Sequence, residues 1–426
     1  MNKLIEYQPS QVKKTILEYK KFNTVTYQQI IKSAKKLDGK VVLHINSACK
    51  GGGVAELLRS QVAIEQSLDI RSYWFVMQVP ERFFAITKKI HNLLQGDSNV
   101  LNKKEKDYYL AISHKIGKSL TLILDNLKPD IIMIHDPQPL PLILFIPKNL
   151  TAILRLHPDL SHPCLKAINL LKPFITRFNG MILSNSSYSR SFPWLKSKNI
   201  RIIMPAIDPL SEKNRLMDMQ VAQSILKNYN IDCSKPIISQ VSRFDYWKDP
   251  LGVVKAYFLA KKKIPELQLI LAGFFLAQDD PEALSVFKEV KKFSHGHSGI
   301  FLFSDPRKLK SVTIDLFVNA VYTASTIMIQ KSIREGFGLT ITEAMWKGKA
   351  VIAGKSQGAL VQIKNKKNGI IISSPKEAGT AIVRLLQNNN ERLRLGKAAV
   401  KSVKRKFLLP RFILENLKAY IAFSKK

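Results

Sequence analysis

Several features are scarce in this sequence, and each scarcity excludes a class of protein. Its 426 residues include three cysteines, Cys49, Cys164 and Cys233, and this odd, scattered set indicates neither a disulfide framework nor a zinc site. The longest apolar run, LPLILFIP at 140–147, is far too short to cross a bilayer. The first residues, MNKLIEYQPS, lack an apolar core, so we expect no signal peptide. A cytoplasmic protein is the simplest account.

Acidic residues are also scarce. The 32 Asp and Glu residues stand against 67 Lys and Arg residues, which gives a formal net charge of +35. A net positive charge of this size attracts nucleic acid, membrane surfaces or small anionic substrates. The lysines are spread along the chain, and no zinc finger, helix-turn-helix or aromatic-interleaved basic patch accompanies them, which argues against nucleic acid. We therefore interpret most of the charge as solvated surface, with a peripheral membrane role as the main competing interpretation.

Short apolar runs that alternate with amphipathic segments are abundant. Hydrophobic residues make up 46% of the chain, which is typical of globular proteins. Twelve runs are predicted to be strands, at 41–45, 73–77, 131–135, 152–157, 181–184, 200–205, 236–241, 267–273, 300–303, 327–330, 350–354 and 369–373. Alternating strands and helices predict parallel sheets covered on both faces. A chain of this length and strand number favours two doubly wound α/β domains.

The polar stretch at 209–235 is predicted to be a linker between the halves. It divides the chain into a first domain at 1–212 and a second at 213–407. The final segment, about 408–426, has an apolar helical face, and we expect this helix to pack back on the first domain. An eightfold barrel is the alternative, but the strand number and the linker disfavour it. In two-domain α/β proteins, ligands bind in the crevice at the carboxyl ends of the strands.

A glycine run follows the first predicted strand and opens a predicted helix. Gly52 and Gly53, after Gly51, would bring free backbone amides at the positive end of the helix close to a phosphate or hydroxyl group. No GK[ST] sequence follows and the spacing is not GxGxxG, so the run is neither a Walker motif nor a dinucleotide-binding motif. A simple tight turn is the competing interpretation.

Two further strand ends in the first half carry histidines. The loop HDPQP at 135–139 has two prolines, which would hold His135, Asp136 and Gln138 at fixed angles suited to hydrogen bonding with a sugar. His157 stands at the end of the next strand. A lone histidine is more often structural, but polar residues at several strand ends favour a binding role, because those ends meet at one crevice.

The second half carries two cations on a short loop between a strand and a helix. Arg243 and Lys248 lie five positions apart in QVSRFDYWKDP. Together they can grip a diphosphate, the arginine by its planar fork and the lysine as a point charge. The competing interpretation is an exposed loop in which these cations pair with Asp245 and Asp249.

Two glutamates flank a glycine turn in the segment QKSIREGFGLTITEAMWKG at 330–348. Thr340 and Glu343 fit a capping box, in which Thr340 caps a helix and Glu343 reaches back to its free amide. This interpretation leaves Glu335 unexplained. Gly336 and Gly338 would let the backbone approach phosphates, while the following helix turns its positive end toward them.

These segments together resemble the retaining glycosyltransferases of the GT-B fold, glycosyltransferase family 4, whose mark is E-x7-E. Glu335 and Glu343 have that spacing. Within the family the sequence is most similar to the trehalose synthases of the glycosyl-transferring type. The likeness rests on HINSACKGGGVAELL, FFAITKKIHNLLQG, IHDPQP, QVSRFDYWKDPLGVV, DDPE and QKSIREGFGLTITEAMWK, which run from about 41 to 370. It implies two Rossmann-like domains that face each other across a cleft.

The resemblance also implies an activity, namely the transfer of glucose from a nucleoside diphosphate glucose to free glucose with retention, which forms trehalose and could run in reverse. The implied catalytic residues are Glu335, His157, Arg243 and Lys248. The implied donor-binding residues are Arg243, Lys248, Gly336, Gly338, Leu339, Glu343, Gly52 and Gly53. The implied acceptor-binding residues are Asp136, Gln138 and His135. No metal or other cofactor is implied, because the cations and backbone amides take its place at the phosphates.

In more detail, the resemblance implies that Glu343 binds the ribose, that Glu335 lies beside the donor glucose and that His157 contacts the donor sugar. The sequence departs from the group around His157, where Leu156 and Pro158 replace an expected cysteine and isoleucine. The alternatives are a trehalose phosphorylase, another hexosyltransferase such as a glycolipid-forming enzyme at a membrane surface, and a binding protein on a relict transferase fold. A homodimer is left open.

Overall fold

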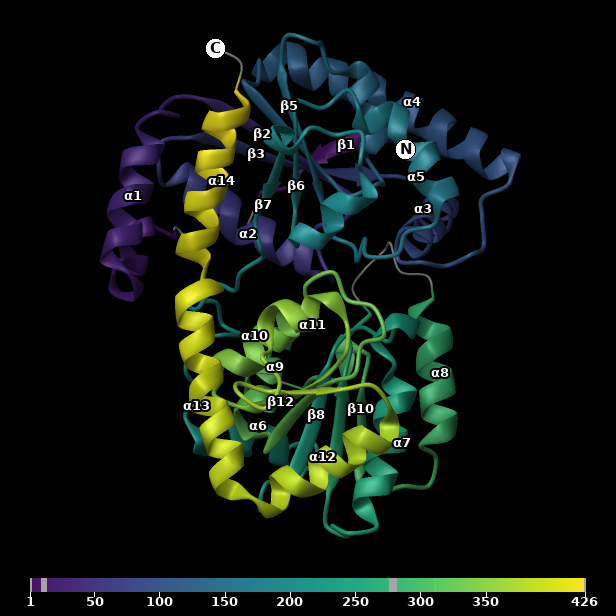
Figure 1. Ribbon diagram of the computed structural model, residues 1–426, viewed down its shortest axis with the longest axis vertical. Coiled ribbons are helices and arrows are strands. Elements are labelled where there is room, and N and C mark those ends of the chain that lie inside the picture. The colour runs from purple at the N-terminus through teal and green to yellow at the C-terminus, as the bar shows by residue number, and fades with distance from the viewer. Residues whose placement is uncertain (1, 9–13, 276–281, 311, 425–426) are drawn as a thin grey trace. The chain divides into compact units, whose positions relative to one another are not determined.

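The computed structural model describes residues 2–8, 14–275, 282–310 and 312–424 (Figure 1). The chain forms two compact units. The first takes Met1–Pro205 and Leu409–Lys426, and the second takes Ala206–Leu276 and Glu282–Leu408. The last helix of the chain therefore belongs to the first unit.

The first unit is built on a seven-stranded sheet with the order β1-β3-β2-β4-β5-β6-β7. Neighbouring strands from β3 to β7 pair in parallel, and β1 pairs antiparallel with β3 at the edge. Every residue of the central strands β2, β4 and β5 is buried, which explains their almost continuous apolar runs. The strands are β1 (Lys3–Glu6), β2 (Val41–Asn46), β3 (Arg71–Gln78), β4 (Ile131–His135), β5 (Thr151–Leu156), β6 (Gly180–Leu183) and β7 (Ile200–Ile202).

Helices cover this sheet and connect its parallel strands. The longer helices are α1 (Thr24–Ala34), α2 (Gly53–Gln66), α3 (Glu81–Leu94), α4 (Lys103–Leu127), α5 (Leu165–Ile175) and α14 (Leu409–Phe423). Short 3-10 helices are η1 (Ile16–Phe22), η2 (Leu140–Phe145), η3 (Ser186–Ser191) and η4 (Ser197–Asn199).

Helix α14 is tied into the first unit by both apolar and polar contacts. Arg155 of β5 is buried, its guanidinium lies 4.6 Å from the ring of Phe412, and it donates a 2.9 Å hydrogen bond to Asn416. Burial lowers the pKa of Arg155 to about 10. At the start of β6, a Cβ at Gly180 would lie 2.5 Å from the ring of Phe423, so a larger residue there would displace that ring.

The second unit is built on a six-stranded, fully parallel sheet with the order β10-β9-β8-β11-β12-β13. Its strands are β8 (Ile237–Val241), β9 (Gln268–Ala272), β10 (Ile300–Phe303), β11 (Ile327–Gln330), β12 (Ala350–Gly354) and β13 (Ile370–Ile372). Its helices are α6 (Met219–Lys227), η5 (Tyr246–Lys248), α7 (Pro250–Lys261), α8 (Ala283–Phe293), η6 (Pro306–Lys308), α9 (Ile314–Ala324), α10 (Leu339–Trp346), α11 (Gln357–Gln362), α12 (Pro375–Gln387) and α13 (Asn389–Lys406).

All twelve predicted strands are present, and the prediction of two parallel doubly wound units is confirmed. Strand β1 was not predicted. The prediction of a linker at 209–235 is wrong, because α6 forms within it and packs against α9 in the second unit. The stretch looks polar because a single face of α6 is apolar, with Ala222, Ile225 and Leu226 buried.

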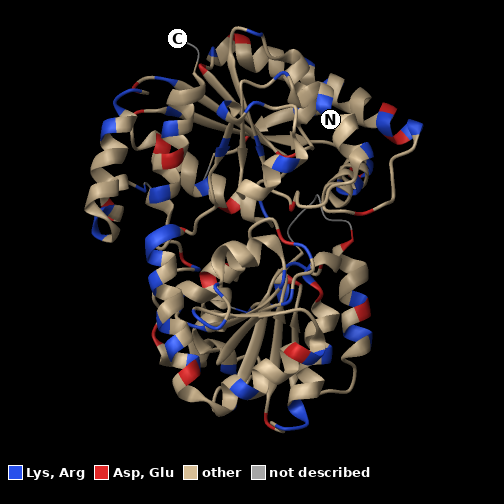
Figure 2. Ribbon diagram, viewed as in Figure 1, with Lys and Arg blue, Asp and Glu red and all other residues tan. Residues whose placement is uncertain are grey.

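The basic charge is distributed over both units. Figure 2 shows Lys and Arg on many helices and loops of each unit. No helix in the part of the chain that the structure describes is long and apolar enough to cross a membrane.

Candidate active site

In the second unit, two of the predicted site loops come together at neighbouring strand ends. Because β8 and β11 pair in parallel, the loops after their carboxyl ends lie side by side. Lys248 in η5 thereby reaches Glu335, and its Nζ lies 2.6 Å from Oε2 of that carboxylate. Ser332 also donates a 3.2 Å hydrogen bond to the same oxygen. Both charged side chains are largely buried, so little solvent screens the pair.

The competing interpretation, in which Lys248 pairs with Asp245 or Asp249, is wrong. The Asp245 carboxylate accepts a 2.8 Å hydrogen bond from the backbone amide of Trp247. Asp249 caps α7 by accepting a 2.9 Å hydrogen bond from Gly252 and also pairs with Lys331. The two aspartates are therefore occupied in shaping the loop, which leaves the Lys248 ammonium to Glu335.

The predicted capping box at Thr340 and Glu343 is also wrong. Helix α10 begins at Leu339, and its N-cap residue Gly338 has a φ of +86° with no side-chain cap. Glycine suits this left-handed conformation, and a Cβ there would also lie 3.0 Å from Cγ of Glu335. The amides of the first turn are thus left without a side-chain cap, as an anion-binding helix end requires. Helix α10 ends near Gly348, where φ is +70°.

Glu343 does not cap its helix because its side chain is directed into the core. Its carboxylate is fully buried, with Lys213 Nζ 2.6 Å from Oε1 and the Tyr322 hydroxyl donating to Oε2 at 2.6 Å. Ribose binding by Glu343 stays a prediction.

Two half-buried lysines lie close to α10. Lys347 donates a 2.6 Å hydrogen bond to the Asn319 side chain, and Lys349 donates one of 2.6 Å to the Thr323 carbonyl. Burial lowers the pKa of each to about 8; for Lys347 the nearby Glu343 opposes this shift.

In the first unit, the predicted histidines join a third in an unbroken line. Nδ1 of His44 lies 3.2 Å from Nε2 of His135, and Nδ1 of His135 lies 3.3 Å from Nε2 of His157. His44 and His135 are buried, whereas His157 is partly exposed. At the inner end of the line, Nε2 of His44 lies 3.0 Å from the carboxylate of Glu65.

Glu65 is a fully buried carboxylate with a complete set of hydrogen-bond donors. Besides His44, it accepts hydrogen bonds from Ser72 at 2.6 Å, Gln61 at 2.8 Å and Tyr420 at 2.8 Å. Burial by itself raises its pKa, but the attraction of His44 and the hydrogen bonds from His44, Ser72 and Gln61 outweigh this effect and leave the pKa lowered. The carboxylate is therefore ionised at neutral pH.

Burial acts in the opposite sense on the two outer histidines. It holds the pKa of His135 and of His157 well below the usual range, and the positive charge of Arg155 adds to the effect on both. Both rings are neutral at physiological pH.

The loop between the outer histidines is held by Asp136. This residue has a φ of +68°, its carboxylate accepts a 2.8 Å hydrogen bond from the backbone amide of His157, and its own amide donates to the Arg155 carbonyl at 2.8 Å. Gln138 is buried, and its Oε1 accepts no hydrogen bond from the residues that the structure describes. An unmet buried acceptor costs free energy that the hydroxyl of a bound sugar would recover.

The predicted glycine run does open a helix. Gly52 is the N-cap residue of α2 and Gly53 its first residue, and Gly51 has a φ of +82°. Within the described residues, no group of three or more His, Cys, Asp or Glu side chains could hold a metal ion.

Comparison with known proteins assigns a family. Residues 44–190 match the family model described as the N-terminal domain of trehalose synthase, and residues 222–402 match the model of glycosyl transferases group 1. The trehalose synthase of Pyrococcus horikoshii is 37% identical over 386 residues, which cover 89% of each chain. The chain belongs to the trehalose synthase family. It is therefore a trehalose-related hexosyltransferase.

Other members and neighbours of the family agree with this assignment. The trehalose synthase of Rubrobacter xylanophilus is 34% identical over 92% of this chain and 93% of its own. The trehalose phosphorylase of Pleurotus pulmonarius is 26% identical over 81% of this chain, and the chain spans 52% of its length. The structure of α,α-trehalose 6-phosphate synthase from Burkholderia multivorans has a TM-score of 0.70 at 12% identity, covering 91% of this chain and 100% of that one. The predicted GT-B fold is confirmed.

Four residues of the site, Glu65, Tyr322, Lys213 and His44, were not predicted from the sequence. Glu65 and Tyr322 lie inside helices and look like ordinary helical residues, and Lys213 falls in the stretch predicted to be a linker. His44 had a signal that could have found it, because it stands in a fully buried strand, where a histidine must have a hydrogen-bonding partner.

Proposed function

We propose that this member of the trehalose synthase family transfers glucose from a nucleoside diphosphate glucose to free glucose with retention of the anomeric configuration, forming trehalose. The observation that carries the proposal is its 37% identity to a trehalose synthase over 89% of both chains. The second unit supplies the donor site, and the first unit supplies residues for the sugars. The same groups serve the reverse reaction.

The proposed donor site uses Arg243, Lys248 and the backbone of the glycine turn at Gly336, Gly338 and Leu339 to hold the diphosphate. Lys248 lies 2.6 Å from Glu335, so one cation links the diphosphate to the carboxylate that faces the donor glucose. As the bond to the sugar breaks, negative charge grows on the diphosphate and positive charge on the anomeric carbon. Lys248 and Arg243 stabilise the first and Glu335 the second. The leaving phosphate takes the proton of the acceptor hydroxyl, and no metal is required.

In the first unit, the proposed acceptor residues are Asp136 and Gln138, while His157 contacts the donor sugar and Gly52 and Gly53 present the amides at the start of α2. The buried Oε1 of Gln138, which accepts no hydrogen bond from the described residues, supports a role of Gln138 in binding the acceptor. His135 has both ring nitrogens in the histidine line, so its contribution is to hold His157 in place.

The test is a donor and acceptor screen. The protein is incubated with ADP-, UDP- or GDP-glucose and glucose, with and without a metal chelator, and the products are examined for a non-reducing disaccharide. Trehalose formed from one of these donors, with undiminished rate in the chelator, is the expected result. Glucose 1-phosphate formed from trehalose only when inorganic phosphate is present would instead make the protein a phosphorylase, the activity named for its more distant relatives.

A further inference from the structure

The line of three histidines in the first unit allows two arrangements of protons when Glu65 is ionised and the two outer rings are neutral. In the first, His44 is neutral. It donates through Nε2 to Glu65 and accepts at Nδ1 from His135, which in turn accepts at Nδ1 from Nε2 of His157. Nδ1 of His157 is then a bare acceptor.

In the second arrangement, His44 carries an extra proton and donates through both nitrogens. His135 then accepts at Nε2 and donates through Nδ1 to Nε2 of His157, whose own Nδ1 must carry a proton. The two arrangements differ by one proton and reverse every hydrogen bond between the rings. The positive charge falls on His44, the histidine that contacts the ionised Glu65.

We propose that Glu65 and His44 are positioning residues that set whether Nδ1 of His157 accepts or donates a hydrogen bond to a sugar hydroxyl. A proton taken up at Nδ1 of His157 releases the Nε2 proton to His135. His135 passes its Nε2 proton to His44, and the charge appears beside Glu65. This inference rests on the proposed function, because that function supplies the hydroxyl.

The surroundings favour His157 as the histidine of the line that contacts the sugar hydroxyl. His157 is the one residue of the three that is partly exposed, and no described residue makes a hydrogen bond to its Nδ1. The other titratable groups near the line are Arg155, which opposes a charge on the outer rings, Asp136 at the amide of His157, and Tyr420, which donates to Glu65. Burial and the charge of Arg155 disfavour a proton that stays on His135 or His157.

The test needs no substrate, so it can fail independently of the proposed function. The full chain is labelled with ¹⁵N-histidine and titrated from about pH 8 to about pH 5, while the ring nitrogens are observed by NMR. We expect His135 and His157 to change together, each ring exchanging the nitrogen that carries its proton. The proposal is overturned if either outer ring becomes cationic itself, or if both rings keep their tautomers over the whole range.

A matched pair of variants adds a kinetic readout. Glu65→Gln removes the charge beside His44, whereas Glu56→Gln makes the same change on the same helix, outside the line. We expect Glu65→Gln to abolish the joint change of tautomer of His135 and His157 and to shift the acidic limb of the pH profile of kcat/KM. Glu56→Gln should change neither. An unchanged acidic limb in a folded Glu65→Gln protein would refute the positioning role, and if that variant does not fold, the wild-type titration still decides.

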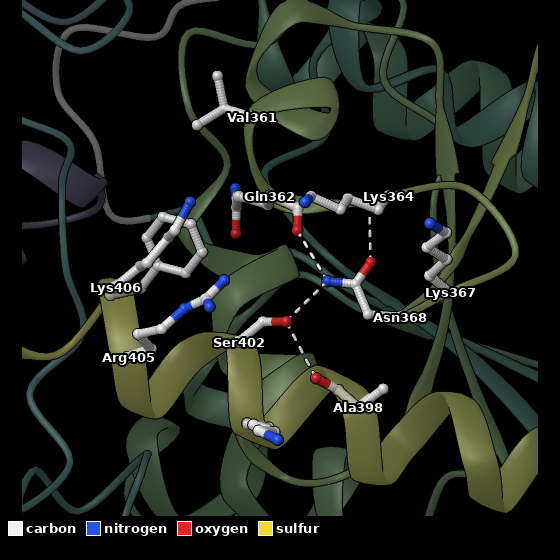
Figure 3. A pocket seen from close by; sticks show the side chains of 11 residues that line it. Val361, Gln362, Lys364, Lys367, Asn368, Ala398, Ser402, Arg405 and Lys406 are labelled. Carbon is white, nitrogen blue, oxygen red and sulfur yellow. Dashed lines mark hydrogen bonds between the residues drawn. The ribbon is translucent and has the colours of Figure 1, made fainter.

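A second, independent observation concerns a cavity of about 220 Å³ in the second unit, between α11, the loop before β13 and the last turns of α13 (Figure 3). Of its eleven lining residues five are basic, against about two at the average content of the chain, and none is acidic. The five are Lys364, Lys367, Lys401, Arg405 and Lys406. Figure 3 shows Arg405 and Lys406 on one side and Lys364 and Lys367 on the other.

The floor of this cavity is polar and fixed by hydrogen bonds. Asn368 donates to the Ser402 hydroxyl and to the Gln362 carbonyl, each at 3.0 Å, and accepts from the amide of Lys364 at 2.7 Å. The Gln362 side chain donates to the carbonyls of Phe337 at 2.6 Å and Gly338 at 3.1 Å. The floor is therefore tied to the glycine turn before α10.

The five cations line the cavity, and no acidic residue is among its lining residues. None of their side chains makes a hydrogen bond or ion pair with the residues that the structure describes. Arg405 and Lys406 in the last turn of α13 suit the negative end of that helix, but this reason does not extend to Lys364 and Lys367 in the loop. We propose that the cavity binds a small phosphate-bearing anion, because like charges around a recess favour a compact polyvalent anion.

Two variants of α13 provide the test, since each removes two exposed cations from the same helix. Lys401→Ala with Arg405→Ala changes the cavity, whereas Lys397→Ala with Lys404→Ala does not touch its lining. Inorganic pyrophosphate is titrated calorimetrically into the full chain, and Arg243→Ala identifies any binding at the donor site. We expect Lys401→Ala with Arg405→Ala to weaken one pyrophosphate-binding event by about tenfold or more. That event should be unchanged in Lys397→Ala with Lys404→Ala and in Arg243→Ala.

An equal loss in the two α13 variants would show a general effect of the positive field and overturn the proposal. A loss confined to Arg243→Ala would assign all pyrophosphate binding to the donor site and would also overturn it. Neither outcome bears on whether the protein makes trehalose.

Discussion

Lys213→Met is expected to destabilise the second unit strongly. The Lys213 ammonium lies 2.6 Å from the fully buried carboxylate of Glu343, which also accepts a hydrogen bond from the Tyr322 hydroxyl. Removing one partner of a buried ion pair leaves an uncompensated charge and costs about 3–5 kcal/mol. A unit of this size loses about 2–4 °C of melting temperature per kcal/mol, so we expect a fall of about 6–20 °C.

A double variant separates the ion pair from the packing of the lysine chain. Glutamine at position 343 can still accept the Tyr322 hydrogen bond but carries no charge, so Lys213→Met with Glu343→Gln is expected to be more stable than Lys213→Met alone. Urea unfolding gives the free energy of unfolding, and scanning calorimetry gives the melting temperature. Both are measured on the wild-type protein, the two single variants and the double variant. Lys288→Met, at an exposed site in α8, is the control and should change stability by less than about 0.5 kcal/mol.

The reasoning is refuted if Lys213→Met costs no more than the Lys288→Met control. It is also refuted if the double variant is less stable than Lys213→Met by the full cost of Glu343→Gln, because the two charges would then act independently.

The remaining predictions concern the donor site and pH. Arg243→Ala is expected to lower turnover by about 100-fold or more; normal transfer of glucose with unchanged donor affinity would remove Arg243 from the diphosphate site. Glu335→Ala is expected to keep nucleoside diphosphate affinity within a few-fold by calorimetry and to lose about 100-fold in kcat, and a loss of binding instead would contradict its place beside the sugar. The pKa of Lys349 is lowered from 10.5 to about 8, so the unfolded chain binds more protons between these values and the second unit should gain stability as the pH rises through them. Urea unfolding at both ends of this range should show a smaller gain in Lys349→Met.

The strands of this protein could be predicted because most of them are buried on both faces. Such strands require nearly continuous apolar runs, and the order of the helices between them implies parallel pairing. Strand β1 escaped prediction because it has four residues and buries one of them, Leu4. Helix α6 escaped because its narrow apolar face lies within a mostly polar stretch.

The candidate site was predictable only where local sequence determines it. The approach of Lys248 to Glu335 follows from two neighbouring strand ends, and the glycine turn follows from its own residues. The pairs Glu65–His44 and Lys213–Glu343 depend on tertiary packing, because a buried charge takes whichever partner the fold brings to it. The same effect explains the wrong capping box, since the sequence pattern was present but Glu343 is more stable beside Lys213 and Tyr322 than at the helix end.

The placement of α14 in the first unit has a consequence for the order in which the protein is made. Asn416 contacts Arg155, and Tyr420 donates a hydrogen bond to Glu65, so the polar core of the first unit is completed by residues translated after the whole second unit. While the ribosome synthesises residues 206–408, the Glu65 carboxylate lacks its hydrogen bond from Tyr420 and the Arg155 guanidinium lacks its hydrogen bond to Asn416. The nascent second unit can therefore finish folding first. The first unit is completed when α14 leaves the ribosome and packs against it.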